Sequence, residues 1–268
     1  MPKLNVNGCN IYYEVRGNEN SNDVVVFLNG VMATFNSWGF QIPVFEKGFK
    51  ILLHDFRGQL LSDKPKGPYS FKMHADDLKA LLDHVGIKKA HIIGTSYGGE
   101  VGIKFAIEYP EMVKSLAIID SVSEVDDLLR MFALQWRQLA VDKDPIKFYY
   151  GMLPSIYGNT FIKNNRKFLE TRGEGLKNVD PSYFDGQVAL YDTFLTLNLT
   201  PELHKIKAPT IVVVGEDDIL KRRKLSDIIV NNIPKCEYVI IPDCGHVTIF
   251  EKPDTLNSIL LGFVTKNL

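Results

Sequence analysis

The sequence has little cysteine and no run of apolar residues long enough to cross a membrane. Its three cysteines, Cys9, Cys236 and Cys244, are odd in number and show no close cysteine/histidine ligand spacing. We therefore expect neither a disulfide framework nor a structural zinc site. A reducing compartment is the simplest interpretation, and no apolar run approaches the roughly 20 residues of a membrane span. Together these features predict a cytoplasmic protein.

The sequence also lacks a signal peptide and an excess of charge of either sign. Residues 1–17 alternate polar and apolar side chains, which is typical of a strand and not of a signal peptide. Lys+Arg total 31 and Asp+Glu 32, so the formal net charge is -1. Neither a nucleic acid nor an anionic membrane is thus expected as a partner. The one dense basic cluster, residues 221–224, is interpreted as the solvated face of a helix.

What is present is an alternation of strand and helix patterns. Continuous β-branched runs, typical of strands buried on both faces, occur at 23–30, 49–56, 88–96, 113–121, 208–218 and 236–246. Residues 70–86 keep helical spacing, with Ser70 placed as N-cap and Gly86 as C-terminal stop. A last helix is expected from about Pro253. The alternation predicts an α/β fold with a doubly wound sheet.

The strand pattern is interrupted between residues 123 and 206, where only amphipathic helices are indicated. We expect residues 1–122 and 207–268 to form the core domain and residues 123–206 a helical cap, or lid. The cap is rich in aromatic residues. Most of them are expected to form its own small core, and the others to line an apolar pocket. The candidates for substrate contact are Phe132, Trp136, Tyr150 and Tyr157.

The stretch Gly94-Thr95-Ser96-Tyr97-Gly98 lies where a predicted strand ends and a helix begins. So tight a turn forces its central residue toward strained backbone angles, and glycines two residues before and after it leave the necessary room. The turn would expose Ser96 above the carboxyl ends of the strands, where open α/β sheets bind ligands. Ser96 is therefore the candidate nucleophile.

A serine hydroxyl needs a general base within reach and an acid to orient that base. Of the six histidines, His246 is the best placed, because it follows the last strand in the motif Asp243-Cys244-Gly245-His246. Carboxylates at residues 216–218 end the penultimate strand, and Asp120 ends the strand that follows the nucleophile helix. Asp218 and Asp120 both satisfy the chain order nucleophile, acid, base.

A tetrahedral intermediate also needs donors for its oxyanion, and backbone N–H groups suit this role because they are rigid and already aimed. One candidate is the N–H of Tyr97, at the start of the nucleophile helix. The other is the N–H of Val31, in the loop where Asn29-Gly30 ends a buried strand.

With these motifs in order, the chain resembles the α/β-hydrolase superfamily over nearly its whole length. The matching segments are FLNGVMATFNSW (27–38), HDFRGQLLSDKP (54–65), GTSYGG (94–99), GEDD (215–218) and DCGH (243–246). The resemblance implies Ser96 as nucleophile, Asp218 as triad acid and His246 as base. It also implies a mostly parallel, eight-stranded sheet with the helical cap inserted after the sixth strand. Residues 66–83 resemble the branch of 3-oxoadipate enol-lactonases, small carboxylesterases and cofactor-free haloperoxidases.

Three positions depart from the family pattern. Asn29 stands where the family usually has histidine, and a proline often found after the acid is missing after Asp218. Leu60 replaces the second glycine of the Asp-x-Arg-Gly-x-Gly-x-Ser loop. Because leucine does not readily take a positive φ, either this loop is reshaped or the mouth of the pocket is more crowded.

The resemblance implies a serine hydrolase, without metal or cofactor, that cleaves a small carboxylic ester or lactone through an acyl-enzyme. The alternatives are a carbon–carbon bond hydrolase with the same triad and a ligand receptor on this fold. Epoxide hydrolases and haloalkane dehalogenases are disfavoured because they carry aspartate where Ser96 stands. The expected partner is a small-molecule ester or lactone, with no nucleic acid or membrane, and the expected state is a monomer or homodimer.

Overall fold

An eight-stranded sheet forms the centre of the computed structural model, which describes residues 2–268. The strands are β1 (Lys3–Val6), β2 (Cys9–Gly17), β3 (Val24–Leu28), β4 (Lys50–His54), β5 (Ala90–Thr95), β6 (Val113–Ile119), β7 (Thr210–Gly215) and β8 (Cys236–Ile241). Their order across the sheet is β1-β2-β4-β3-β5-β6-β7-β8. The pairs β1/β2 and β2/β4 are antiparallel and the others are parallel. The predicted doubly wound, mostly parallel sheet is thus confirmed.

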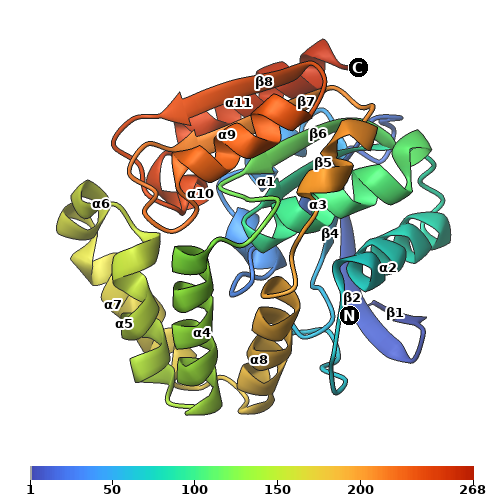
Figure 1. Ribbon diagram of the computed structural model, residues 1–268. Coiled ribbons are helices and arrows are strands. Elements are labelled where there is room, and N and C mark those ends of the chain that lie inside the picture. Colours follow the sequence, from blue (N-terminus) through green and yellow to red (C-terminus); the bar gives the residue numbers. More distant parts are fainter. Residues whose placement is uncertain (1) are drawn as a thin grey trace.

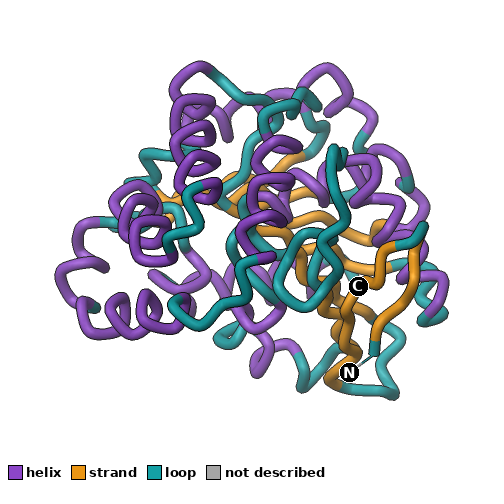
Figure 2. Tube along the Cα trace, turned by 90° about the horizontal axis from the view of Figure 1, so that it is seen from below, coloured by secondary structure: helices purple, strands orange, loops and turns teal. Residues whose placement is uncertain are grey.

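Helices cover both faces of the sheet, so the strands run through the middle of the molecule (Figure 2). One face packs against α2 (Phe71–His84), α3 (Tyr97–Glu108) and α9 (Arg223–Asn232), and the other against α1 (Ile42–Phe45) and α11 (Pro253–Lys266). Along β3, Val24 and Val26 belong to the first core, while Val25 and Phe27 belong to the second. Because both faces are buried, the strands appear in the sequence as continuous apolar runs. Shorter helices are η1 (Phe35–Trp38), η2 (Pro110–Met112) and α10 (Thr248–Glu251).

The helix predicted over 70–86 is present as α2. Its N-cap is Ser70, whose hydroxyl accepts a hydrogen bond from the Met73 N–H at 3.1 Å. Two residues after its last residue, Gly86 takes a φ of 74°, which lets the chain leave the helix. Both predicted capping residues are confirmed.

The segment between β6 and β7 is helical, and its first five helices gather to one side of the sheet (Figure 1). They are α4 (Asp127–Val141), α5 (Pro145–Ile156), α6 (Asn159–Asn164), α7 (Arg166–Leu176) and α8 (Ser182–Phe194). The short helix η3 (Thr200–Lys205) that follows them contacts α3 and α9. The two ends of the segment meet, because Glu124 and Asn198 form a β-bridge and the Leu199 N–H donates to the Ser123 carbonyl at 2.7 Å. We therefore keep residues 123–206 as the proposed cap.

The three cysteines are free thiols; Cys9 and Cys244 are buried, and Cys236 is partly buried. Over residues 2–268, none of the helices has both the length and the apolar character that crossing a membrane requires.

Candidate active site

Ser96 occupies a sharp turn between β5 and α3, with φ 53° and ψ -122°. A Cβ atom on Gly94 would lie 2.4 Å from the carbonyl oxygen of Gly98. A Cβ atom on Gly98 would lie 2.1 Å from the carbonyl oxygen of Leu28. No side chain fits at either position without moving backbone. The predicted need for glycine two residues before and after the serine is therefore a real steric requirement of this turn.

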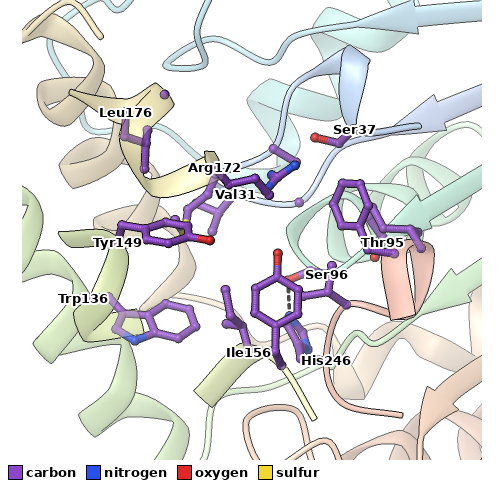
Figure 3. Close-up of a pocket in the computed structure, with 18 of the residues that line it drawn as sticks. Val31, Ser37, Thr95, Ser96, Trp136, Tyr149, Ile156, Arg172, Leu176 and His246 are labelled. Carbon is purple, nitrogen blue, oxygen red and sulfur yellow. Dashed lines mark hydrogen bonds between the residues drawn. The ribbon is translucent and has the colours of Figure 1, made fainter. Parts of the chain in front are cut away.

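His246 and Asp218 continue from Ser96 as a hydrogen-bonded chain. The Nε2 atom of His246 lies 3.0 Å from Ser96 Oγ, the contact drawn as a dashed line in Figure 3. The Nδ1 atom of His246 lies 2.8 Å from Asp218 Oδ2. The other carboxylate oxygen of Asp218 accepts from the N–H groups of Leu220 and Lys221 at 2.9 and 2.8 Å. The acid is thus fixed by backbone, and the imidazole is oriented between acid and serine.

Asp120, the rival acid, is fully buried but has other partners. Its Oδ1 accepts from the Gly215 N–H at 3.0 Å, and its Oδ2 accepts from the Thr248 hydroxyl at 2.8 Å. These bonds join the loops that carry Asp218 and His246. Burial, reinforced by the charge of Asp218, raises the pKa of Asp120 to about 7. Of the two candidates, Asp218 is the one hydrogen-bonded to the imidazole.

The loop after β3 lies against the nucleophile, since a Cβ atom on Gly30 would be 3.6 Å from Ser96 Cβ. The Gly30 carbonyl accepts from the side-chain amide of Gln59 at 2.8 Å. In a trans peptide the carbonyl of residue 30 and the N–H of Val31 point in opposite directions, so this bond turns the Val31 N–H away from Gln59. Gln187 of α8 holds the next carbonyl, that of Val31, at 3.2 Å.

Tyr97 is the first residue of α3, where backbone N–H groups have no partner within the helix. Its N–H and that of Val31 remain our candidates for the oxyanion donors. Gln59 and Gln187, which fix the loop, were not identified from the sequence, because side-chain amides have no characteristic spacing.

Two of the departures from the family pattern are explained by packing. Asn29 is fully buried; its amide donates to the His54 carbonyl at 2.7 Å and its oxygen accepts from the Trp38 indole at 3.0 Å. Leu60 is 38% exposed, has no positive φ, and is not among the residues lining the cavity above Ser96. The alternative of a crowded pocket mouth is therefore wrong, and the loop is reshaped, with Gln59 turned inward instead.

A cavity of about 330 Å³ opens above Ser96 and His246 beneath the cap helices. Trp136 of α4, Tyr149 of α5 and Tyr157 line it, and Figure 3 shows Trp136 and the Tyr149 hydroxyl facing the nucleophile. The Tyr149 hydroxyl and the Trp136 indole nitrogen are buried without a hydrogen-bond partner among residues 2–268. Both atoms are thus covered by neighbouring protein atoms, although their rings line the cavity. Arg172 of α7 lines the cavity as well.

Of the four cap residues predicted to contact substrate, Trp136 and Tyr157 line the cavity and Phe132 and Tyr150 do not. Tyr150 is 46% exposed, because it follows Tyr149 on a helix and consecutive side chains point about 100° apart. Phe132 lies beside the face of α4 that is turned toward Ser96. That face carries Leu129, Ala133 and Trp136.

A second, much smaller compartment of about 20 Å³ also borders Ser96. It shares Val31, Ser96 and Trp136 with the large cavity. The rest of its wall is formed by Tyr97, Leu129, Ala133, Tyr191, Phe194, Leu220 and Lys221. This volume holds about one water molecule. Ser96, the candidate nucleophile, therefore lies between a large compartment and a very small one.

The basic cluster at 221–224 is only partly a solvated face. Lys221 is 3% exposed, and its ammonium lies 2.5 Å from Glu100 Oε1 and 3.1 Å from Ser96 Oγ. The interpretation of the cluster is thus wrong for Lys221. Glu100 is the signal that could have corrected it: four residues after Ser96, it follows the serine on the same helix face and needs a cation once it is buried.

The model of the alpha/beta hydrolase fold family matches residues 23–253, and the chain belongs to that family. The solved α/β-hydrolase MGS-M2, from a Medee basin deep-sea metagenome library, is 30% identical, with a TM-score of 0.93 over 98% of this chain and 96% of that one.

Two further proteins are similar over nearly their full length. The putative carbamate hydrolase RutD of Azorhizobium caulinodans is 26% identical over 98% of both chains. Est816, described as an N-acyl homoserine lactone degrading enzyme, is 26% identical, with a TM-score of 0.83 over 98% of this chain and 100% of that one. These relatives support hydrolase activity. Their names describe different substrates, a carbamate for RutD and an N-acyl homoserine lactone for Est816.

Proposed function

We propose that the protein is a serine hydrolase that cleaves a small carboxylic ester or lactone through an acyl-enzyme. The observation that carries this proposal is the continuous chain from Ser96 Oγ to His246 at 3.0 Å and from His246 to Asp218 at 2.8 Å, at the floor of a capped cavity. A serine becomes a nucleophile when a base accepts its proton and an acid orients that base.

In the first half-reaction, Ser96 Oγ attacks the carbonyl carbon while His246 Nε2 takes the hydroxyl proton. The carbonyl oxygen becomes an oxyanion, for which the N–H groups of Val31 and Tyr97 are the proposed donors. When the tetrahedral intermediate collapses, the bond to the alkoxide breaks and His246 returns the proton to that leaving group. Asp218 stabilises the imidazolium meanwhile.

In the second half-reaction, a water molecule takes the place of the alcohol. His246 removes its proton as the water attacks the acyl carbon, and the oxyanion forms at the same position as before. Collapse now breaks the bond to Ser96 Oγ, and His246 returns the proton to the serine. The acid is released and the triad is restored.

The two compartments beside Ser96 restrict the substrate. The large one, of about 330 Å³, accommodates a bulky group, whereas the small one, of about 20 Å³, leaves room for little more than a methyl or amino group. An open-chain substrate should thus have at least one small substituent on its carbonyl. A carbamate meets this condition with its amino group, which makes carbamate hydrolysis, named for the relative RutD, the second candidate function.

A matched substrate panel tests this restriction. We expect p-nitrophenyl acetate to be cleaved with a kcat/KM at least about tenfold higher than p-nitrophenyl octanoate, and methyl octanoate at least about tenfold higher than octyl octanoate, because the first ester of each pair is bulky on one side only. The two esters of a pair share the same type of leaving group. Lactones and p-nitrophenyl carbamate complete the panel. Leu129→Ala, which enlarges the small compartment, should reduce the difference in kcat/KM within each pair. Equal rates within both pairs would contradict the two-compartment interpretation, and no turnover of any substrate would contradict the proposed function.

The pH dependence follows from the surroundings of His246. Burial lowers the pKa of this imidazole, but the charge and hydrogen bond of Asp218, aided by Asp120, outweigh that effect and raise the pKa above 6.5. His246 acts as a base only when neutral, so kcat/KM should rise with pH through this raised pKa and be lost below it. Asp120→Asn, which removes one nearby negative charge, should move this limb toward lower pH. A limb below pH 6 in the wild type would contradict the assignment.

The two remaining alternatives, a ligand receptor and a carbon–carbon bond hydrolase, differ from an esterase in the number of turnovers and in the products formed. A ligand receptor on this fold would hydrolyse an ester at most once per molecule, whereas an esterase releases many equivalents of p-nitrophenolate. A carbon–carbon bond hydrolase would leave the esters largely intact and cleave a vinylogous diketone. One multiple-turnover assay with both substrate types therefore distinguishes the three functions.

A further inference from the structure

A buried ion pair lies directly against the proposed nucleophile. The Lys221 side chain is 4% exposed and that of Glu100 is 0% exposed, with 2.5 Å between Nζ and Oε1. The same ammonium lies 3.1 Å from Ser96 Oγ, and 4.9 Å from the centre of the Phe194 ring. It is thus surrounded by one carboxylate, one hydroxyl and one aromatic face.

A contribution to folding stability does not by itself explain why this buried ion pair is present. Taking two charges out of water costs more than their attraction usually returns, and apolar residues of similar volume often serve the fold as well or better. The neighbouring positions of α3 are indeed small or apolar: Val101, Gly102 and Ile103. Glu100 interrupts this series of small and apolar residues at the position where its ion pair with Lys221 contacts Ser96. Buried charges that depart from the local sequence pattern in this way are concentrated at functional sites.

We propose that Lys221 is a fourth catalytic side chain, whose ammonium donates a hydrogen bond to Ser96 Oγ and stabilises negative charge on that oxygen. Glu100 is the positioning residue that holds the ammonium in place. The inference rests on the proposed function, since it presupposes that Ser96 forms the acyl-enzyme.

The hydrogen bonds at Ser96 are compatible with one another. The serine O–H donates to His246 Nε2, and a lone pair of the same oxygen accepts from Lys221. When Oγ attacks, its proton moves to His246, and when the C–Oγ bond breaks, the electron pair returns to Oγ and the proton comes back from His246. Lys221 acts here only as a hydrogen-bond donor and transfers no proton to Ser96 Oγ.

The effect of this donor differs between the two half-reactions. A hydrogen bond to Oγ engages a lone pair near the one that attacks the substrate, so it helps acylation little. During deacylation Oγ is the leaving group, and an ammonium at 3.1 Å stabilises the charge that it acquires. Lys221 should therefore accelerate breakdown of the acyl-enzyme more than its formation. Because Glu100 neutralises the ammonium, the pair does not attract anionic substrates over a distance.

The decisive variant is the double substitution Lys221→Met with Glu100→Gln, which removes both charges and leaves no unpaired charge in the core. In stopped-flow experiments with p-nitrophenyl acetate, we expect its deacylation rate to fall about 10- to 100-fold, with a burst approaching one p-nitrophenolate per enzyme. Lys104→Met is the matched control, since it breaks the ion pair with Glu108 on the same helix, and it should leave both rates unchanged.

Two results would overturn the proposal. The first is a double variant that folds, as judged by thermal unfolding, and turns over at the wild-type rate without a burst. The second is a slow single variant Lys221→Met whose rate is restored by adding Glu100→Gln, because Lys221 would then only neutralise Glu100. Failure of the proposed function would be visible earlier, in a wild-type protein that forms no acyl-enzyme at Ser96.

Discussion

Ser96→Ala is expected to lower kcat by about 10⁴- to 10⁶-fold on any ester that the wild type cleaves. Alanine removes the only atom that forms the covalent bond, while the turn keeps its shape because Gly94 and Gly98 supply the room. Binding of the substrate should change little, so a non-hydrolysable analogue should bind both proteins alike. Steady-state kinetics on p-nitrophenyl acetate measures the loss.

A fluorophosphonate probe gives this experiment an independent readout. The wild type should be labelled once, at the peptide containing Ser96, and the alanine variant not at all. Cys9 and Cys244 are buried thiols and should not react in its place. Equal ester hydrolysis by the two proteins would refute the nucleophile assignment.

Asp218→Asn should cause the second-largest loss, roughly 10⁴-fold in kcat. The amide can present its nitrogen to His246 Nδ1 and so favour the wrong tautomer of the imidazole, although shape and volume are preserved. Asp120→Asn should cost less than about tenfold, because the amide oxygen can still accept from the Gly215 N–H while the amide nitrogen donates to the Thr248 hydroxyl oxygen. Both variants are compared with the wild type at pH 8.

The reverse order of effects would overturn the choice of acid. A large loss in Asp120→Asn alone would mean that this carboxylate, and not Asp218, orients the imidazole in the working enzyme. Thermal unfolding of both variants separates a catalytic effect from a loosening of the loops that Asp120 joins.

The fold was predictable because its signals are local. Each buried strand is a continuous β-branched run, and α2 begins and ends at a recognisable cap. The proximity of Ser96 and His246 was predictable for the same reason: each belongs to a motif at a strand end, where parallel strands bring their carboxyl termini to one edge. Local sequence signals could not decide between Asp218 and Asp120. The decision depends on which of the two carboxylates lies beside His246 Nδ1, and this is set by how distant loops pack at the edge of the sheet.

The surroundings of the nucleophile were harder to predict, since they depend on contacts between distant segments. Lys221 sits among three other basic residues, and only its position opposite Glu100 distinguishes it. Tyr150 is predicted to contact the substrate, but its neighbour Tyr149 lines the cavity instead, because a shift of one residue along α5 changes which ring faces it. The periodicity of the apolar residues predicts that one face of such a helix is buried. It does not predict which residues or which cavity that face contacts.

The cap is fastened to the catalytic loops themselves. Gln187 of α8 holds the Val31 carbonyl at 3.2 Å, and the Ile156 carbonyl at the end of α5 accepts from the His246 N–H at 3.1 Å. A swing of the cap as one rigid body would therefore pull on the oxyanion loop and on the base at the same time. If the proposed cap opened widely, these hydrogen bonds would break and the candidate oxyanion loop and base would lose their positions, so we expect substrate to enter while the cap stays in place.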